Sequence, residues 1–427
     1  MSLQCDPDIG RALGGEEPSR LNKTAPCSLQ VRGGTELRRR RNLCSATTTN
    51  SVPLTHSMAD ITPSIDTRRM LQRRPILILA LDGGGVRGLS SLILLRGLME
   101  RVAVARNTST HEPMTVRPSE YFDLIIGAGT GGICALFLGR LRMTVDEAIS
   151  AYQELVEAAF QPPSSFSSSF QRASSSQKLE KCVGDIIQRF LDDRNAPLSD
   201  PAGGSYTCRT AVLATTPAYI DAPPHIFRSY VTSEPPSLFL VHEVARAAVA
   251  IPGTSHSVSL GNPSIQFTSA DVFGYNNPAE VGFSEAEENI PGRVACLVSL
   301  GAGLQKVVHV DSQRKTFSTA RIRISSDCES VHDRMRRYGR TRNLDYFRFN
   351  VTHGLEDDIQ EWTPLDSGHI AGITEGYMRN DQVTGSLNSC AQRLVGERKY
   401  DLIWFILNNS NSSISGSKIA RDFSRNI

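Results

Sequence analysis

The residues best placed to do chemistry lie in a run of small residues, Gly127-Ala128-Gly129-Thr130-Gly131-Gly132. An apolar run from Phe122 to Ile126 precedes them, and another from Ile133 to Leu138 follows. This order predicts a strand, a tight turn and a helix, the layout in which a Gly-x-Ser-x-Gly elbow holds a nucleophile above a sheet. The middle position is Gly129 rather than serine. The sequence therefore predicts the frame of a hydrolytic site, with Gly127 and Gly131 in the elbow, and no nucleophile at its centre.

A second glycine-rich segment, Gly83-Gly84-Gly85-Val86-Arg87-Gly88, follows an apolar run and precedes a helical pattern. It fits the spacing of a dinucleotide-binding turn, but that site also needs an acidic residue about 20 residues on, after a second strand. Only Glu112 is present there, in polar sequence. We favour an oxyanion hole made by backbone N–H groups of Gly83, Gly84 and Gly85, with Arg87 adding positive charge. The plainer alternative is a tight turn that uses glycine for positive φ.

Two successive strand–turn–helix units predict a parallel α/β sheet that positions these glycines. The unbroken apolar run from Ile76 to Leu81 predicts a strand buried on both faces. Further strands are expected at 210–215, 226–231, 294–300 and 347–351, and a helix at 241–250. Thr144 and Glu147 form a capping box that opens another helix. A Ser-rich linker is expected at 164–176, before a short helix that ends near residue 190.

The composition is that of a globular protein, with 40% hydrophobic and 21% charged residues among 427. No run of about 18 apolar residues predicts a membrane span, and the N-terminus lacks the apolar core of a secretory signal. The nine cysteines are dispersed, which favours reduced thiols in a cytoplasmic protein. No His or Cys spacing typical of a metal site occurs, so we expect neither a metal nor a cofactor.

Four segments are expected along the chain. Residues 1–74 hold 12 Lys or Arg against 7 Asp or Glu and read as a disordered basic arm. This arm is either a tether to anionic membrane or nucleic acid, a nuclear import signal, or simply a solvated tail; Met58 is an alternative start of the chain. A catalytic-type domain is expected over 75–303, an extension packed on it over 304–407, and a flexible tail over 408–427.

Taken together, these segments resemble the patatin-like phospholipase family, and within it the fungal members. The resemblance rests on Asp82 to Leu89, Tyr121 to Gly127, Gly139-Arg140-Leu141, Met143 to Glu147, Ala245-Arg246-Ala247, Gly274 to Pro278, and Ser299 to Gly303. It implies a three-layer α/β/α sandwich around a mostly parallel sheet. It also implies lipid acyl hydrolysis by a Ser–Asp dyad, with the glycine-rich loop as the oxyanion hole and no cofactor.

This chain departs from that pattern at both positions of the dyad. The serine position falls on Gly129, and the position of the acid, counted back four residues from Gly274, falls on Ala270. Thr130 and Asp271 each lie one residue further on. A Thr130–Asp271 dyad would need both turns to shift by one residue, which would aim the side chains elsewhere. The sequence thus predicts a degenerate dyad.

Three functional hypotheses remain open. The first is a hydrolytically inactive lipid acyl hydrolase scaffold that binds lipid or regulates. The second is residual hydrolysis of phospholipid or acylglycerol esters, and so a part in lipid breakdown, through a nucleophile such as Thr130 with Asp271. The third is a decaying paralogue or a faulty gene model. We expect a lipid or membrane surface as the partner, no nucleic acid, and peripheral membrane association of a cytoplasmic protein.

Overall fold

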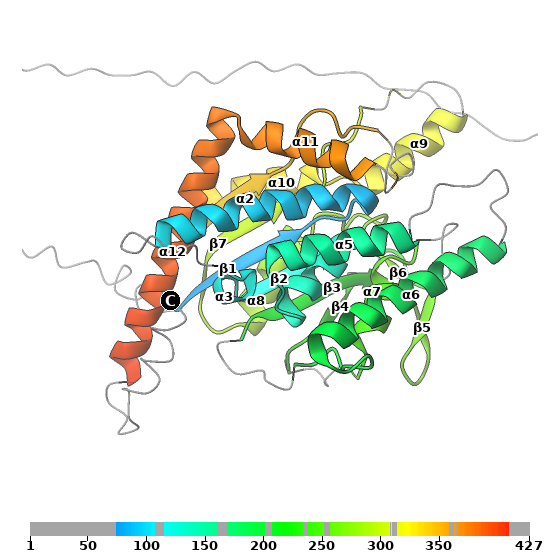
Figure 1. Ribbon diagram of the computed structural model, residues 1–427, viewed down its shortest axis with the longest axis horizontal. Coiled ribbons are helices and arrows are strands. Elements are labelled where there is room, and N and C mark those ends of the chain that lie inside the picture. Colours follow the sequence, from blue (N-terminus) through cyan, green and yellow to red (C-terminus); the bar gives the residue numbers. More distant parts are fainter. Residues whose placement is uncertain are drawn as a thin grey trace, which may run out of the picture. The chain divides into compact units, whose positions relative to one another are not determined.

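Strand β1 (Pro75–Leu81) lies at the centre of a mixed, mostly parallel sheet in the computed structural model (Figure 1). All seven of its residues are buried, as the unbroken apolar run predicts. Strands β2 (Leu124–Ala128) and β7 (Arg293–Leu300) pair with it in parallel on its two sides. Strands β3 (Arg209–Thr215) and β8 (Asp345–Phe349) extend the sheet in parallel beyond them. The described strands follow the order β5-β6-β3-β2-β1-β7-β8, with β4 also on β3.

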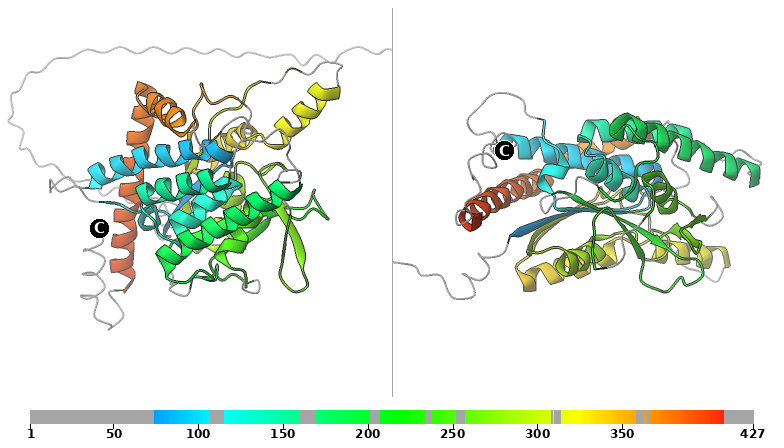
Figure 2. Two further views of the ribbon diagram at one scale, coloured as in Figure 1. Left: turned by 45° about the vertical axis from the view of Figure 1, so that its right-hand side comes forward. Right: turned by 90° about the horizontal axis from the view of Figure 1, so that it is seen from below.

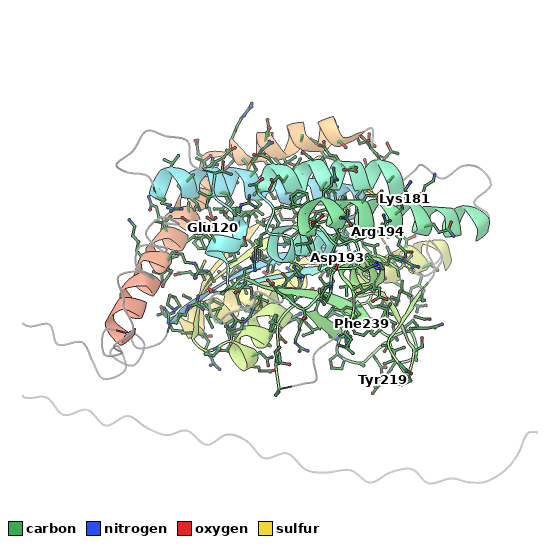
Figure 3. The ribbon with its side chains drawn as sticks, turned by 60° about the horizontal axis from the view of Figure 1, so that its bottom comes forward. Glu120, Lys181, Asp193, Arg194, Tyr219 and Phe239 are labelled. Carbon is green, nitrogen blue, oxygen red and sulfur yellow. The ribbon has the colours of Figure 1, made fainter. Side chains whose placement is uncertain are left out.

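The antiparallel strands gather at the β3 end of the sheet. Both β4 (His225–Arg228) and β6 (Ile265–Ser269) run antiparallel to β3, and β5 (Val258–Leu260) forms a hairpin with β6. Phe239, labelled in Figure 3, packs edge-on against Phe227, with ring centroids 5.1 Å apart, and approaches Phe267 at 6.2 Å. These aromatic contacts join β4 and β6 to the segment that leads into helix α7 (Val241–Ala248).

Helices cover both faces of the sheet, because alternate side chains of β1 enter two separate cores. Leu77, Leu79 and Leu81 belong to one core. It is covered by α2 (Gly88–Arg106), α5 (Val145–Ala159), α6 (Ser169–Leu191), α7 and α12 (Asp381–Asn409). Ile76, Ile78 and Ala80 enter the other core, under α8 (Ala279–Asn289) and α10 (Glu329–Arg342). The two layers of helices are seen from below in Figure 2. The predicted α/β/α sandwich is confirmed.

Short helical elements connect the strands to these layers. A turn of 3-10 helix (Gly85–Arg87) leads from β1 into α2, and α3 (Pro118–Tyr121) precedes β2. Helix α4 (Thr130–Ala135) follows β2 and continues into a π-helical turn, Leu136–Arg140.

The residues after 303 take part in the same sheet and the same layers. They supply β8 at the sheet edge, α9 (Arg314–Ser325), α10, and the helices α11 (Ser367–Met378) and α12, which pack on α2. A buried hydrogen bond of 2.8 Å from Thr374 Oγ1 to Ser90 Oγ fastens α11 to α2. The C-terminal extension and the region before it therefore share one sheet and one core.

The structure describes residues 74–106, 115–159, 169–200, 207–233, 238–251, 257–307, 309, 314–357, 363 and 366–409. These residues fall within one unit, Thr62–Ile427. The arm expected over residues 1–74 lies outside them except for Arg74, and so does the expected tail after Asn409. No helix in the described part of the chain is both long and apolar enough to span a membrane.

Candidate active site

The two glycine-rich segments meet where β1 and β2 end. In the parallel pairing of these strands, Leu81 lies opposite Gly127. The turn after Leu81 holds the glycine loop, and the turn after Ala128 holds the elbow. Because the carboxyl ends of parallel strands share an edge of the sheet, segments about 45 residues apart in sequence become neighbours. The sheet thus brings together the predicted oxyanion loop and the predicted nucleophile position.

Gly129 has the backbone conformation of a nucleophile elbow. Its φ of 55° and ψ of −134° lie in a region that side chains rarely adopt, and helix α4 begins at the next residue. The neighbouring turn is packed backbone against backbone. A β-carbon at Gly131 would lie 2.5 Å from the carbonyl oxygen of Asp82, and one at Gly127 would lie 2.5 Å from the nitrogen of Gly132. Side chains are therefore excluded at 127 and 131 by backbone atoms.

The carboxylate of Asp271 fills the space that a side chain at 129 would occupy. A β-carbon at Gly129 would overlap Oδ2 of Asp271 and lie 2.8 Å from its Cγ. The Ser269 hydroxyl donates to Asp271 Oδ1 at 2.6 Å. Burial raises the pKa of Asp271 to about 6, although that hydrogen bond favours the charged form. A carboxyl group that titrates near neutrality thus lies against the empty elbow.

Ala270, by contrast, points away from the elbow. Its side chain is fully buried in the core beneath α8, in a cluster that includes Ala128, Leu213 and Ala279. Of the two neighbours, the structure brings Asp271 to Gly129, while Ala270 packs against the sheet.

The backbone N–H groups of the glycine loop are already bonded within the protein. Gly83 N–H donates to the carbonyl of Asn276 at 3.3 Å. Gly84 N–H donates to the Thr130 hydroxyl at 3.2 Å, and that hydroxyl lies 3.5 Å from the Gly85 carbonyl. Tyr152 also donates to the Gly85 carbonyl, at 2.5 Å. The Thr130 hydroxyl is therefore engaged with the glycine loop, and two of the three expected oxyanion donors have partners.

Arg87 does not point into the space above the elbow. Its guanidinium is 1% exposed and donates to the carbonyls of Leu355 and, at 3.3 Å, Asp357. The side chain therefore supports the segment that follows β8. The hydrogen bonds of this guanidinium to Leu355 and Asp357 do not support the predicted role of its charge at an oxyanion.

A buried ion pair, which the sequence did not reveal, fixes the start of the glycine loop. Asp82 is the residue that links β1 to the glycines, and its Oδ2 accepts a 2.7 Å bond from Arg348 Nη2 on β8. The same guanidinium bonds Glu329 at 2.9 Å and the Ser299 hydroxyl at 2.9 Å. Burial opposes its charge, but the Asp82 carboxylate raises the pKa of Arg348 well above its ordinary value. The signal available in the sequence was Asp82 itself, because an acid at the end of a buried strand needs a cationic partner.

The Asn276-Asn277-Pro278 motif holds the Asp271 turn against the segment before α10. Asn276 Nδ2 donates to the Ser326 carbonyl at 2.8 Å, and Asn277 Nδ2 donates to the Cys328 carbonyl at 3.0 Å. Asn277 Oδ1 also accepts the N–H of Ala279 at 3.0 Å, which starts α8. This motif therefore positions backbone around the site.

Residues 79–280 match the family model described as patatin-like phospholipase. The chain carries a patatin-like phospholipase domain. Its boundaries enclose the glycine loop, the elbow, Asp271 and the double asparagine motif. The shared domain accounts for the frame of the site, and β8 with Arg348 lies beyond it.

Relatives of this patatin-like domain are known from animals and plants. The chain is 27% identical over 337 residues to human calcium-independent phospholipase A2-gamma, covering 72% of this chain and 39% of that protein. It is 24% identical to Phospholipase A I of Arabidopsis thaliana, covering 74% of this chain and 28% of that one. With Patatin-like protein 4 of the same plant it is 28% identical over 38% of this chain and 39% of the relative. The chain thus spans well under half the length of these proteins.

Among solved structures, VipD from Legionella pneumophila aligns with 81% of this chain and 78% of its own, at 12% identity and a TM-score of 0.31. Within the described residues, no group of three or more His, Cys, Asp or Glu side chains could hold a metal ion.

The raised pKa of Asp271 predicts a pH dependence of stability. The folded carboxyl titrates near pH 6, while the unfolded one titrates near 3.8. The stabilisation that the protonated Asp271 carboxyl gives to the folded state is fully present below pH 3.8 and is lost as the pH rises through about 6. Between pH 4 and 7.5, the free energy of unfolding of the wild type should fall by about 2–3 kcal/mol relative to that of Asp271→Asn. Urea unfolding at each pH measures this, and parallel pH profiles would refute the assignment.

The ion pair between β8 and the glycine loop gives a second prediction. Arg348→Met leaves the Asp82 carboxylate buried without its cation and should lower the free energy of unfolding by about 3–5 kcal/mol. Asp82→Asn/Arg348→Met should recover a large part of that loss, because the fully buried carboxylate is gone and Glu329, which also loses its cation, is 38% exposed to water. Chemical unfolding of the two variants decides the matter: equal losses in both would show that Arg348 acts through packing alone.

Proposed function

We propose that this chain is a lipid acyl hydrolase scaffold that has lost its nucleophile and now binds lipid, or regulates through that binding, without hydrolysing it. The observation that carries the proposal is Gly129, a residue without a side chain at the centre of an intact elbow. A covalent acyl transfer needs a hydroxyl or thiol at this point. Losing the nucleophile of such a hydrolase typically costs about a million-fold in rate.

The distinction between Gly129 and its neighbours supports this proposal. Backbone atoms block a β-carbon at Gly127 and Gly131, so the fold itself requires glycine there. At Gly129 the three atoms nearest to a β-carbon all belong to the side chain of Asp271. The φ of 55° at Gly129 also favours glycine, but it is the conformation that an elbow imposes on its nucleophile. We therefore attribute the glycine at 129 to the loss of a serine.

We further propose that Asp271, and not residue 270, holds the place of the acid. Its carboxylate lies against Gly129, whereas Ala270 is packed in the core. In this account the scaffold has kept its acid, and the single missing chemical group is the hydroxyl.

Residual hydrolysis by Thr130 with Asp271 is the alternative that the geometry supports less. The Asp271 carboxyl is near the elbow, as such a dyad needs. The Thr130 hydroxyl, however, accepts the Gly84 N–H and lies on the glycine-loop side of the turn. To attack an ester it would have to leave that bond, and the loop would lose a partner.

Lipid is proposed as the ligand from the nature of the domain. Two of the relatives are named phospholipases, and the matched family model carries the same description. The names of the longer relatives suggest lipid as the ligand class, and the chain's own site suggests that the lipid is bound without being hydrolysed.

Restoring the hydroxyl tests the proposal. Gly129→Ser should raise hydrolysis of a fluorescent phospholipid at least about a hundredfold above wild type, because Asp271 can then accept the serine proton after a small rotation. Gly129→Ala is the matched control: it adds the same β-carbon without a hydroxyl and should stay at the wild-type level. Gly129→Ser/Asp271→Asn should lose the gain.

Three outcomes would contradict the proposal. Substantial turnover by the wild type that Thr130→Ala abolishes would establish the alternative dyad. A gain that requires Gly129→Ser together with Ala270→Asp, and is indifferent to Asp271→Asn, would return the acid to position 270. Co-sedimentation of wild type with phospholipid vesicles tests the binding half of the proposal, and no retention would refute it.

A further inference from the structure

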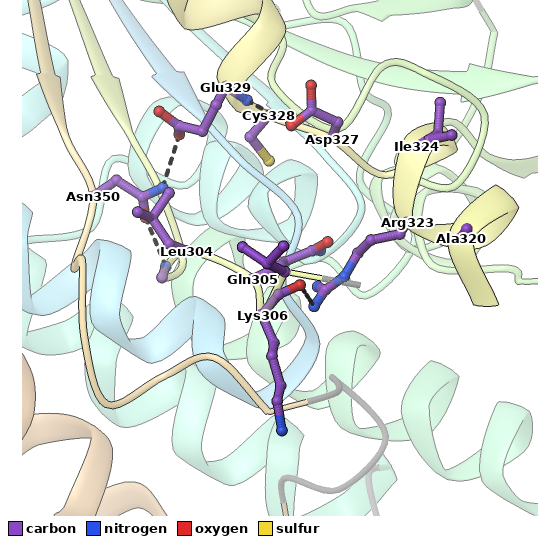
Figure 4. A pocket seen from close by; sticks show the side chains of 12 residues that line it. Leu304, Gln305, Lys306, Ala320, Arg323, Ile324, Asp327, Cys328, Glu329 and Asn350 are labelled. Carbon is purple, nitrogen blue, oxygen red and sulfur yellow. Dashed lines mark hydrogen bonds between the residues drawn. The ribbon is translucent and has the colours of Figure 1, made fainter. Parts of the chain in front are cut away.

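A cavity of about 430 Å³ lies between the segment after β7 and helix α9. In Figure 4, Leu304 and Lys306 line one side of it, and Ala320 and Ile324 of α9 line the other. Its volume falls within the range of roughly 300–1,000 Å³ usual for small-molecule sites. The residues that line it come after residue 280, so the cavity belongs to the part of the chain outside the match to the family model.

The cavity begins beside the glycine loop. The β-carbon of Ala302 packs against Gly84, and a β-carbon added at Gly84 would overlap it. Gly303, the next residue, lines the cavity. Asn350 lines it as well and accepts the Gly303 N–H at 2.8 Å. One wall of the cavity therefore continues into the segment that packs on the glycine loop.

Apolar side chains are left open to solvent at this cavity. Val307 is 93% exposed and Ile324 is 76% exposed, and both line it, together with Leu304 and buried Ala320. Exposed apolar surface that borders a cavity of ligand size is typical of a binding site. The apolar part of a ligand would cover these side chains.

Two cations and two acids line the same cavity. Lys306 is exposed and makes no ion pair among the described residues, and Arg323 reaches across to donate to the Lys306 carbonyl. The two acids that line the cavity are bonded elsewhere. Asp327 accepts from the Ser330 hydroxyl and two backbone N–H groups, and Glu329 pairs with Arg348 and Asn350. Lys306, exposed and without an ion pair in the described part of the chain, is the lining charge that an anionic group of a ligand would complement.

We propose that this cavity binds a single-chain anionic lipid, with the acyl chain between Leu304 and Ile324 and its carboxylate or phosphate at Lys306 and Arg323. The volume suits one chain rather than the two chains of a phospholipid. The inference rests on the proposed function only for lipid as the ligand class, and it is independent of whether Gly129 abolishes hydrolysis.

Fluorescence titration of the full chain with cis-parinaric acid, and its displacement by oleate, tests the proposal. Helix α9 offers a matched pair of variants. Ile322 and Ile324 are 64% and 76% exposed, but only Ile324 lines the cavity. Ile324→Asp should weaken binding at least about tenfold, since losing contact with two methylene groups already costs about that much. Ile322→Asp should bind like the wild type.

The charge at the rim is tested in the same way. Lys306→Glu should weaken oleate by about two- to fivefold and leave uncharged monoolein unchanged. Arg321→Glu, an exposed cation of α9 that does not line the cavity, is the control and should have no effect. Displacement by lysophosphatidic acid and by oleate separates a phosphate from a carboxylate as the preferred anion.

Equal losses from Ile322→Asp and Ile324→Asp would overturn the proposal and assign α9 to docking on a membrane surface instead. Absence of parinaric acid binding by wild type would overturn it outright. If vesicle binding persists in that case, the proposed lipid-binding function stands and only the cavity is excluded. If Gly129→Ser fails to gain turnover while oleate still binds, the catalytic proposal fails and the cavity remains.

Discussion

The parallel pairing of β1 with β2 determines the form of this site. It places the turn after Leu81 against the turn after Gly127, so closely that backbone atoms pack on backbone atoms. Gly127 and Gly131 are the consequence, since neither has room for a β-carbon. Gly129 lies in the same turn under a different constraint. The atoms nearest to a β-carbon at this position belong to the side chain of Asp271. Its φ and ψ are those that an elbow imposes on a nucleophile.

The turns around the elbow are held in place by side chains that make structural contacts rather than by the proposed catalytic groups. Arg348 joins β8 to Asp82, and the double asparagine holds the Asp271 turn to the segment before α10. The Thr130 hydroxyl accepts the hydrogen bond of the Gly84 N–H. Each contact stabilises the fold whether or not an ester is present. The proposed loss of the hydroxyl is therefore compatible with a loop and an elbow that stay in place.

The central strands and the capping of α5 could be predicted from the sequence because their signals are local. The run from Ile76 to Leu81 is buried as expected, and Thr144 and Glu147 form the expected reciprocal bonds at 3.2 and 2.7 Å. The strand expected at 210–215 forms, while that at 226–231 ends earlier, at Arg228. The linker expected through Ser176 is wrong in its second half, because α6 already begins at Ser169 and serine is a weak helix breaker.

The parts that the sequence could not give depend on tertiary contacts. Counting along the motif identifies residue 270 as the acid position, but which of two neighbouring side chains faces the elbow is decided by the turn after β6. Arg348 lies 266 residues from Asp82, in an alternating segment that reads only as a strand. The α9 cavity likewise forms between segments whose own patterns show no ligand site.

The claim that the elbow is intact but without a nucleophile is tested most directly by a fluorophosphonate probe, which bonds covalently to an activated hydroxyl. Mass spectrometry after labelling should find no adduct on the wild-type chain and a single adduct at residue 129 of Gly129→Ser. An adduct on Thr130 of the wild-type chain would contradict the account, because it would show a working nucleophile in a site that we describe as having none.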